Sequence, residues 1–194
     1  MQKLDRAQLF SLEQYAEKRP DFRARVIAHK KPRKVLLGDH VSLHFEDRMT
    51  IQYQIQEMLR VERIFEAEGI QEELDAYNPL IPDGQNLKAT MLIEYAEVDE
   101  RKQALARMIG IEDRVCVQIA GFEPAFAIAD EDLERENDEK TSSVHFLRFE
   151  FDPAMISALK QGAALHMGID YPNYNVALAP VSEETRLALL ADFD

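Results

Sequence analysis

The chain has 194 residues, of which 46% are hydrophobic and 30% charged, and its net charge is −13. This size and balance are typical of a globular protein, so we expect residues 1–194 to form one domain. The negative charge disfavours wholesale binding to nucleic acid or to an anionic membrane, and no apolar run is long enough to span a bilayer. The lone Cys116 excludes an intrachain disulfide. Because the first residues lack a signal-peptide core, the sequence predicts a cytoplasmic protein, and its compactness is typical of bacteria.

The first third of the chain is predicted to be mainly helical, with one hairpin. Apolar spacing predicts a helix over residues 5–18, and Pro20 is suited to open a second helix that runs to residue 28. Two strands over residues 34–37 and 41–46 are joined by Gly38-Asp39, which is typical of a hairpin. Asp47 is a suitable N-cap for a long amphipathic helix, which we expect to end at Gly69.

The second part of the chain, after a turn-rich loop at residues 77–84, is predicted to be mainly strands. We expect strands over residues 88–95, 114–120, 125–129, 144–151, 164–170 and 176–179. We expect short helices over residues 71–77, 99–109, 153–161 and 183–190. This order favours an α+β fold in which N-terminal helices and a hairpin pack with a mainly antiparallel sheet that carries short helices.

The strand at residues 41–46 and the following helix contain candidate metal ligands. His44 and Glu46 share the polar face of the strand about 7 Å apart, within reach of one ion or of a hydrogen-bond network. In the helix, Glu62 falls among apolar positions at 100° per residue, and a buried carboxylate needs a cation, a hydroxyl or a metal as its partner. These three residues predict a site for a single metal ion or a small molecule. The simpler alternative is a water-facing strand and an ion pair from Glu62 to Arg23 or Arg25.

Four further residues are candidates for ligand binding. Arg48 and Arg60 lie on the same helix as Glu62, toward its more polar side. Tyr77 and Asn78 precede a proline-rich loop, and such loops often carry sites, although Asn-Pro is also ordinary turn chemistry. By contrast, we expect His145, in a predicted strand, to be a hydrogen-bonded core or edge residue.

Charge is unevenly distributed along the chain. Residues 19–34 contain seven Arg or Lys residues and one acid, whereas residues 130–140 contain seven acids and two basic residues. Solvated surface is the usual interpretation of such runs, and the alternatives are an anion-binding face or a contact between the two segments within or between subunits. Glycine-rich phosphate loops and the motifs HExxH, GxSxG and paired CxxC are absent from the sequence.

Several segments carry a family resemblance: VLLG (35–38), FEDRMTIQYQIQEMLRVE (45–62), YNPLIP (77–82) and LKATMLIEY (87–95). They resemble the bacterial family known as domain of unknown function 3501, and the likeness extends over most of the chain. The family has no assigned activity, so the resemblance implies no catalytic residue. Its members are often encoded near rubrerythrin-like and iron–sulfur proteins, which implies an oxidative-stress or electron-transfer setting.

Three hypotheses follow, and whether the protein is an enzyme stays open. The first, which we favour by a small margin, is a non-enzymatic accessory protein that binds a redox or iron–sulfur partner or a second copy of itself. The second is a metal or small-molecule site around Glu62, His44 and Glu46. The third is an anion or nucleic-acid binder that uses Arg19–Lys34, which the net charge of −13 disfavours.

Overall fold

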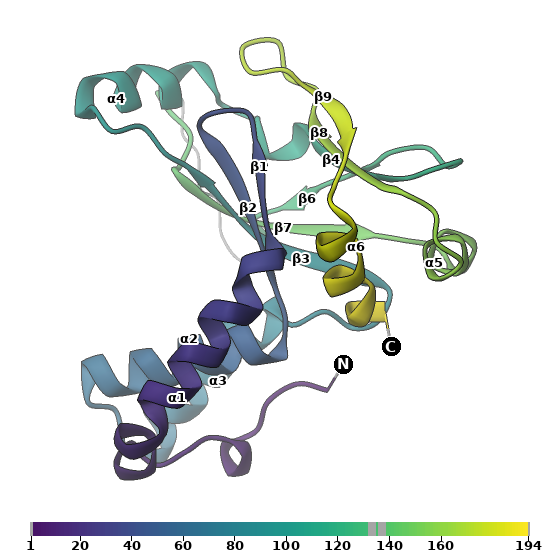
Figure 1. Cartoon of the computed structure of the whole chain (residues 1–194). Helices are drawn as coiled ribbons and strands as arrows, with labels where there is room; N and C mark the ends of the chain where they lie inside the picture. Colours follow the sequence, from purple (N-terminus) through teal and green to yellow (C-terminus); the bar gives the residue numbers. More distant parts are fainter. Residues whose placement is uncertain (1, 132–134, 136–138, 194) are drawn as a thin grey trace.

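A computed structural model describes residues 2–131, 135 and 139–193 (Figure 1). It contains two antiparallel sheets. Sheet A has the strand order β1 (Lys34–Leu37), β2 (Val41–Glu46), β3 (Asn86–Ile93), β7 (Val144–Glu150) and β6 (Ile128–Ala129). Sheet B has the order β5 (Ala125–Phe126), β4 (Val115–Ile119), β8 (Leu165–Ile169) and β9 (Val176–Pro180).

The helices complete an α+β fold, as the sequence predicts. They are α1 (Leu12–Lys30), α2 (Arg48–Glu62), α3 (Ala67–Tyr77), α4 (Val98–Arg107), α5 (Pro153–Lys160) and α6 (Glu183–Leu190). Figure 1 shows α1, α2 and α3 together at one end of the molecule and the sheets at the other, with α6 near their junction. Within the described residues, no helix combines the length and the apolar character that crossing a membrane requires.

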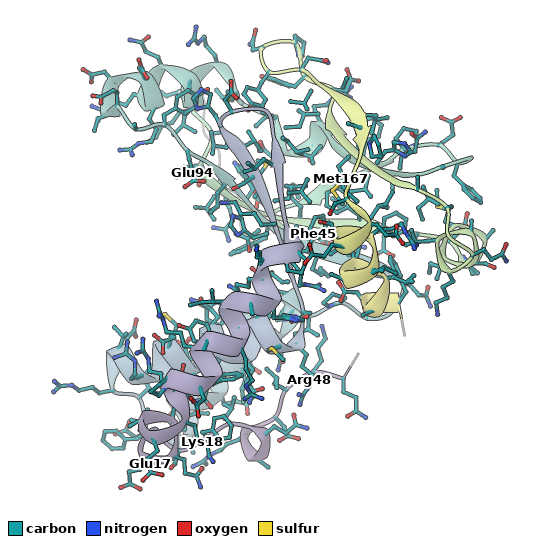
Figure 2. The ribbon with its side chains drawn as sticks, in the orientation of Figure 1. Glu17, Lys18, Phe45, Arg48, Glu94 and Met167 are labelled. Atoms are coloured by element: carbon teal, nitrogen blue, oxygen red, sulfur yellow. The ribbon has the colours of Figure 1, made fainter. Side chains whose placement is uncertain are left out.

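The main core lies between the two sheets and arises from strict alternation along the strands. Leu43 and Phe45 of β2 and Phe149 of β7 point inward from sheet A, and Val117 and Met167 meet them from sheet B, all at most 1% exposed. Figure 2 labels Phe45 and Met167 in this part of the molecule. This burial leaves the opposite face of sheet A free of a second sheet.

The outer face of sheet A is polar, and its register sets neighbouring side chains in rows. Glu46, Lys88 and Arg148 occupy paired positions on β2, β3 and β7. In the adjacent row, His44 pairs with Thr90, which pairs with Phe146. Side chains in such rows lie about 5 Å apart, so charged groups on this face interact across strands.

The helix α1 is continuous, so the prediction that Pro20 opens a second helix is wrong. Tyr15, Phe22 and Val26 recur on one face of α1, and each is at most 4% exposed. They form a small core with Phe10 and Tyr53. Packing of this unbroken stripe outweighs the local cost of a proline inside the helix.

The helix α2 begins as predicted but ends earlier. Asp47 is its N-cap and accepts hydrogen bonds from the N–H groups of Met49 and Thr50. Its C-cap is Arg63, which adopts a left-handed conformation with φ 56°, so the prediction that the helix continues to Gly69 is wrong. Gly69 instead lies inside α3, where a Cβ atom would come within 2.8 Å of Ile64. Glycine here leaves room for the Ile64 side chain from the segment between α2 and α3, and it does not end a helix.

Candidate functional site

The carboxylate of Glu62 is exposed at the last residue of α2, so the prediction that it lies among apolar side chains is wrong. Glu46 immediately precedes the N-cap at the other end of the same helix. A helix of 15 residues is about 22 Å long, so Glu62 and Glu46 cannot hold one ion together. The proposed set of His44, Glu46 and Glu62 is therefore not assembled.

His44 and Glu46 have local hydrogen-bond partners on the outer face of sheet A. The Glu46 carboxylate accepts hydrogen bonds from the hydroxyl groups of Thr50, at 2.5 Å, and Thr90, at 2.9 Å. His44 Nε2 lies 3.1 Å from the hydroxyl oxygen of Ser42, and burial, followed by the charge of Lys34, lowers the pKa of the imidazole. Glu46 thus ties α2 to the sheet, which is a structural role.

The remaining predicted residues are dispersed. Arg60 is exposed and pairs with Glu57 at 3.2 Å, and Arg48 is half-exposed in the first turn of α2. Asn78 binds both backbone groups of Leu4, at 2.8 and 2.9 Å, and so fixes the N-terminal segment. Of these candidates, Tyr77 is the one that lines a pocket beside sheet A.

The basic segment at residues 19–34 is partly neutralised within the molecule. Arg19 makes a bidentate contact of 2.7 and 2.9 Å with Glu57, which also accepts a hydrogen bond from Tyr15. The hydrogen bond from Arg19 holds the pKa of Glu57 at about 2. Arg33 is buried and pairs with Asp192. An arginine of α1 therefore pairs with a carboxylate of α2, but the carboxylate is Glu57 rather than Glu62.

The pocket at Tyr77 has a volume of about 440 Å³, within the range of small-molecule sites. It lies between α3, the short helix Asn78–Leu80 and the outer face of β3 and β7. Its wall is mainly apolar and includes Tyr77, Leu80 and Phe146. Its charged side chains are Lys88, Arg148, Glu131 and Asp75.

Lys88 is the cation of this pocket whose side chain lacks a direct partner among the described residues. Lys88 is half-buried, and burial, followed by the neighbouring charge of Arg148, lowers the pKa of its ammonium group. Within the part of the chain that the structure describes, Lys88 has no hydrogen-bond or ion-pair partner, and Glu131 and Asp83 act on it only at longer range. A desolvated cation of this kind gains by meeting an anion.

Two further cations surround Lys88. Arg148 binds both oxygens of Glu131 at 2.7 Å and also contacts Glu150. Lys3, whose pKa is lowered by burial, donates to the backbone oxygens of Asn78 and Ile81, and its charge acts on Lys88. The pocket therefore places three cations near one another, with Glu131 and Glu150 paired to Arg148.

Lys88 and Arg148 were not among the residues predicted from the sequence. The available signal was the alternation of inward and outward side chains along the strands. In β3, Lys88 lies between the buried Leu87 and Ala89, and in β7, Arg148 follows the buried Leu147. This alternation predicts that Lys88 and Arg148 face outward, but it does not predict that α3 lies over them. Only the sheet register and the helix position bring Lys88, Arg148 and Tyr77 to one pocket.

Comparisons with known proteins place the chain in a family. A family model described as "Protein of unknown function (DUF3501)" matches residues 3–193. A crystal structure at 1.90 Å resolution, described as a novel protein of unknown function from Burkholderia pseudomallei K96243, is 53% identical, with complete coverage of both chains and a TM-score of 0.95. A search of curated proteins found no match. The chain therefore belongs to the DUF3501 family of proteins of unknown function, as the four sequence segments indicated.

Proposed function

We propose that this protein binds a small organic anion, a carboxylate with an apolar body, in the pocket formed by α3, β3 and β7. The observation that carries this proposal is Lys88, a half-buried cation that lines the pocket and has no ion-pair partner among the described residues. Tyr77, Leu80 and Phe146 offer the apolar contacts that would hold the rest of the ligand.

The contact between Arg148 and Glu131 supports the choice of a carboxylate. Arg148 holds the Glu131 carboxylate through two hydrogen bonds of 2.7 Å, the planar geometry that arginine offers to carboxylates. The side chain of Glu131 is 49% exposed, so its displacement by a ligand would need little rearrangement of the core. A ligand carboxylate bound between Lys88 and Arg148 would then compensate both charges.

This proposal predicts that binding depends on the charge of Lys88. A panel of aromatic and aliphatic carboxylates, each paired with its neutral amide, is screened by ligand-observed NMR against the full-length protein. Carboxylates are expected to bind and amides to bind at least tenfold more weakly, since a charge-assisted contact is worth about 1.5–3 kcal/mol. The substitution Lys88→Met should weaken carboxylate binding at least tenfold, and Lys88→Arg should retain most of it.

The matched control is Lys102→Met, which removes an exposed lysine of α4 away from the pocket. It should leave binding unchanged. Equal binding of carboxylates and amides, or carboxylate binding that survives Lys88→Met, would overturn the proposal.

The accessory role predicted from the sequence is retained as a second proposal, in the form of self-association. Two large apolar side chains near the end of α2 support it, because Val61 is 63% and Phe65 is 66% exposed. Sedimentation velocity over a concentration series should show a reversible dimer that Phe65→Ser weakens. A wild-type chain that stays monomeric at every concentration would refute self-association. Binding of a redox partner, implied by the family resemblance, stays a prediction.

A further inference from the structure

A second group of chemistry-bearing side chains lies on the inward side of sheet A, away from the Lys88 pocket. Glu112 begins the short helix before β4, Asp130 follows β6, and His145 belongs to β7. His145 is 0% and Glu112 5% exposed, and the side chain of Asp130 is 10% exposed. One donor atom from each residue lies within 4.8 Å of the other two.

The Nε2 atom of His145 is held by oxygen atoms on one side of the ring. It lies 3.0 Å from the backbone oxygen of Ser142 and 3.0 Å from the hydroxyl oxygen of Thr141. Because a carbonyl oxygen only accepts hydrogen bonds, Nε2 carries the proton that it donates to Ser142. This contact resembles the second hydrogen bond by which proteins orient a metal-binding histidine.

The Nδ1 atom of His145 faces two carboxylates. It lies 2.6 Å from Asp130 Oδ2 and 3.8 Å from Glu112 Oε1. With Nε2 as the donor, neutral imidazole would aim the Nδ1 lone pair at these oxygens, which is unfavourable in a buried site. A positive species at Nδ1 removes this conflict. A proton fits the present separation of 2.6 Å, and a metal cation fits once Asp130 Oδ2 moves to about 3 Å or more from Nδ1.

Both carboxylates are held in place by their second oxygen. Asp130 Oδ1 accepts a hydrogen bond from the N–H of Phe146 at 2.9 Å and pairs with Arg135 at 3.2 Å. The hydroxyl of Thr141 donates to Glu112 Oε2 at 3.4 Å. The other oxygens, Asp130 Oδ2 and Glu112 Oε1, are the ones that face His145 Nδ1.

We propose that Glu112, Asp130 and His145 bind one divalent transition-metal ion. One imidazole nitrogen and two carboxylate oxygens suit ions such as Zn²⁺, Mn²⁺ and Fe²⁺, whereas Mg²⁺ and Ca²⁺ prefer sets made only of oxygen ligands. The two carboxylates supply negative charge for a dication, although Arg135 also pairs with Asp130. This site is independent of the Lys88 pocket, so either proposal can fail without the other.

The test uses Co²⁺ as a spectroscopic probe on full-length protein that has been treated with a chelator and dialysed. We expect uptake of one Co²⁺ ion per chain, with visible absorption bands that Zn²⁺ abolishes by competition. The matched variants Glu112→Gln and Asp130→Asn keep the size of each side chain and remove its charge. Each should weaken Co²⁺ binding at least tenfold, whereas Asp113→Asn, at an exposed neighbouring position, should not.

Two outcomes would overturn the metal proposal in favour of a protonated imidazole held by two carboxylates. One is wild-type protein that takes up no Co²⁺ or Zn²⁺ at millimolar concentration. The other is uptake that Glu112→Gln and Asp130→Asn leave unchanged. If the variants do not fold, anomalous diffraction from Co²⁺-soaked wild-type crystals decides, since the proposal requires a peak between His145 Nδ1 and the two carboxylates and fails without it.

Discussion

Replacing Arg33 with methionine is expected to lower the free energy of unfolding by about 3–5 kcal/mol, the usual cost of breaking a buried ion pair from one side. Arg33 is 2% exposed and donates to the backbone oxygens of Phe45, Glu46 and Ala188 and to the carboxylate of Asp192. Its loss leaves that carboxylate and three carbonyl groups without their donor. Methionine fills part of the volume, so the expected loss arises mainly from unpaired polar groups.

The same unfolding experiment on the wild type tests whether residues 1–194 form one domain. Arg33 joins the end of α1 to β2, α6 and the C-terminal turn, so we expect the wild type to unfold in a single cooperative transition. Denaturant unfolding followed by circular dichroism measures both quantities. The control Arg23→Met, at an exposed position of α1, should change stability by less than about 0.5 kcal/mol. A loss below 1 kcal/mol for Arg33→Met would contradict the assigned role.

The contribution of Asp192 to the stability of the wild type is expected to fall as pH rises from 4 to 7. Asp192 is 0% exposed, and burial raises the pKa of its carboxyl group to about 6 despite the opposing charge of Arg33. Asp47 lies 3.6 Å from the same guanidinium group and has a lowered pKa, so one cation is shared by two carboxylates. Among the described atoms, Oδ1 of Asp192 has no hydrogen-bond partner.

The sign follows from proton binding. The native carboxyl of Asp192 binds a proton up to about pH 6, whereas in the unfolded chain it titrates near pH 4. Its contribution is therefore fully present below pH 4 and is lost as pH rises through 6, by about 3 kcal/mol in all. The variant Asp192→Asn cannot titrate, so its stability relative to wild type should increase over this range. A pH-independent difference, or one of opposite sign, would contradict the assignment.

Local signals in the sequence predict much of the fold. The Gly38-Asp39 hairpin, the Asp47 N-cap and the helix at residues 183–190 are confirmed, because each depends on residues close in the chain. The errors at Pro20 and Gly69 have different causes. At Pro20, tertiary packing of the α1 stripe overrides the local preference of the proline. At Gly69, the helix has already ended at the left-handed Arg63, and the glycine lies inside the next helix.

The sites are harder to predict because they depend on distant contacts. Glu62 was a candidate because the helix was expected to continue to residue 68 and to place this carboxylate among apolar side chains. The helix ends earlier, with Arg63 as its C-cap, and Glu62 is exposed. His145 is a hydrogen-bonded core residue, as expected, and its inward position beside Leu147 was a usable signal for a charged partner. Its partners Asp130 and Glu112 come from separate segments, so no local pattern identifies them.

The two proposed sites lie near each other along the chain but involve different faces of sheet A. His145 points to the core, whereas Phe146 and Arg148, on the same strand, line the anion pocket. Asp130 belongs to the inner cluster, and the next residue, Glu131, pairs with Arg148 in the outer pocket.

The most direct test of the anion-binding proposal is the titration of Lys88 itself. Protein labelled with ¹³C at the lysine ε-carbons, with Lys88 assigned by its loss in Lys88→Arg, is followed by NMR against pH with and without the best carboxylate from the screen. We predict a Lys88 pKa below the ordinary lysine value of about 10.4 in the free protein and a rise when the carboxylate binds. An ordinary pKa that the carboxylate leaves unchanged would contradict the account.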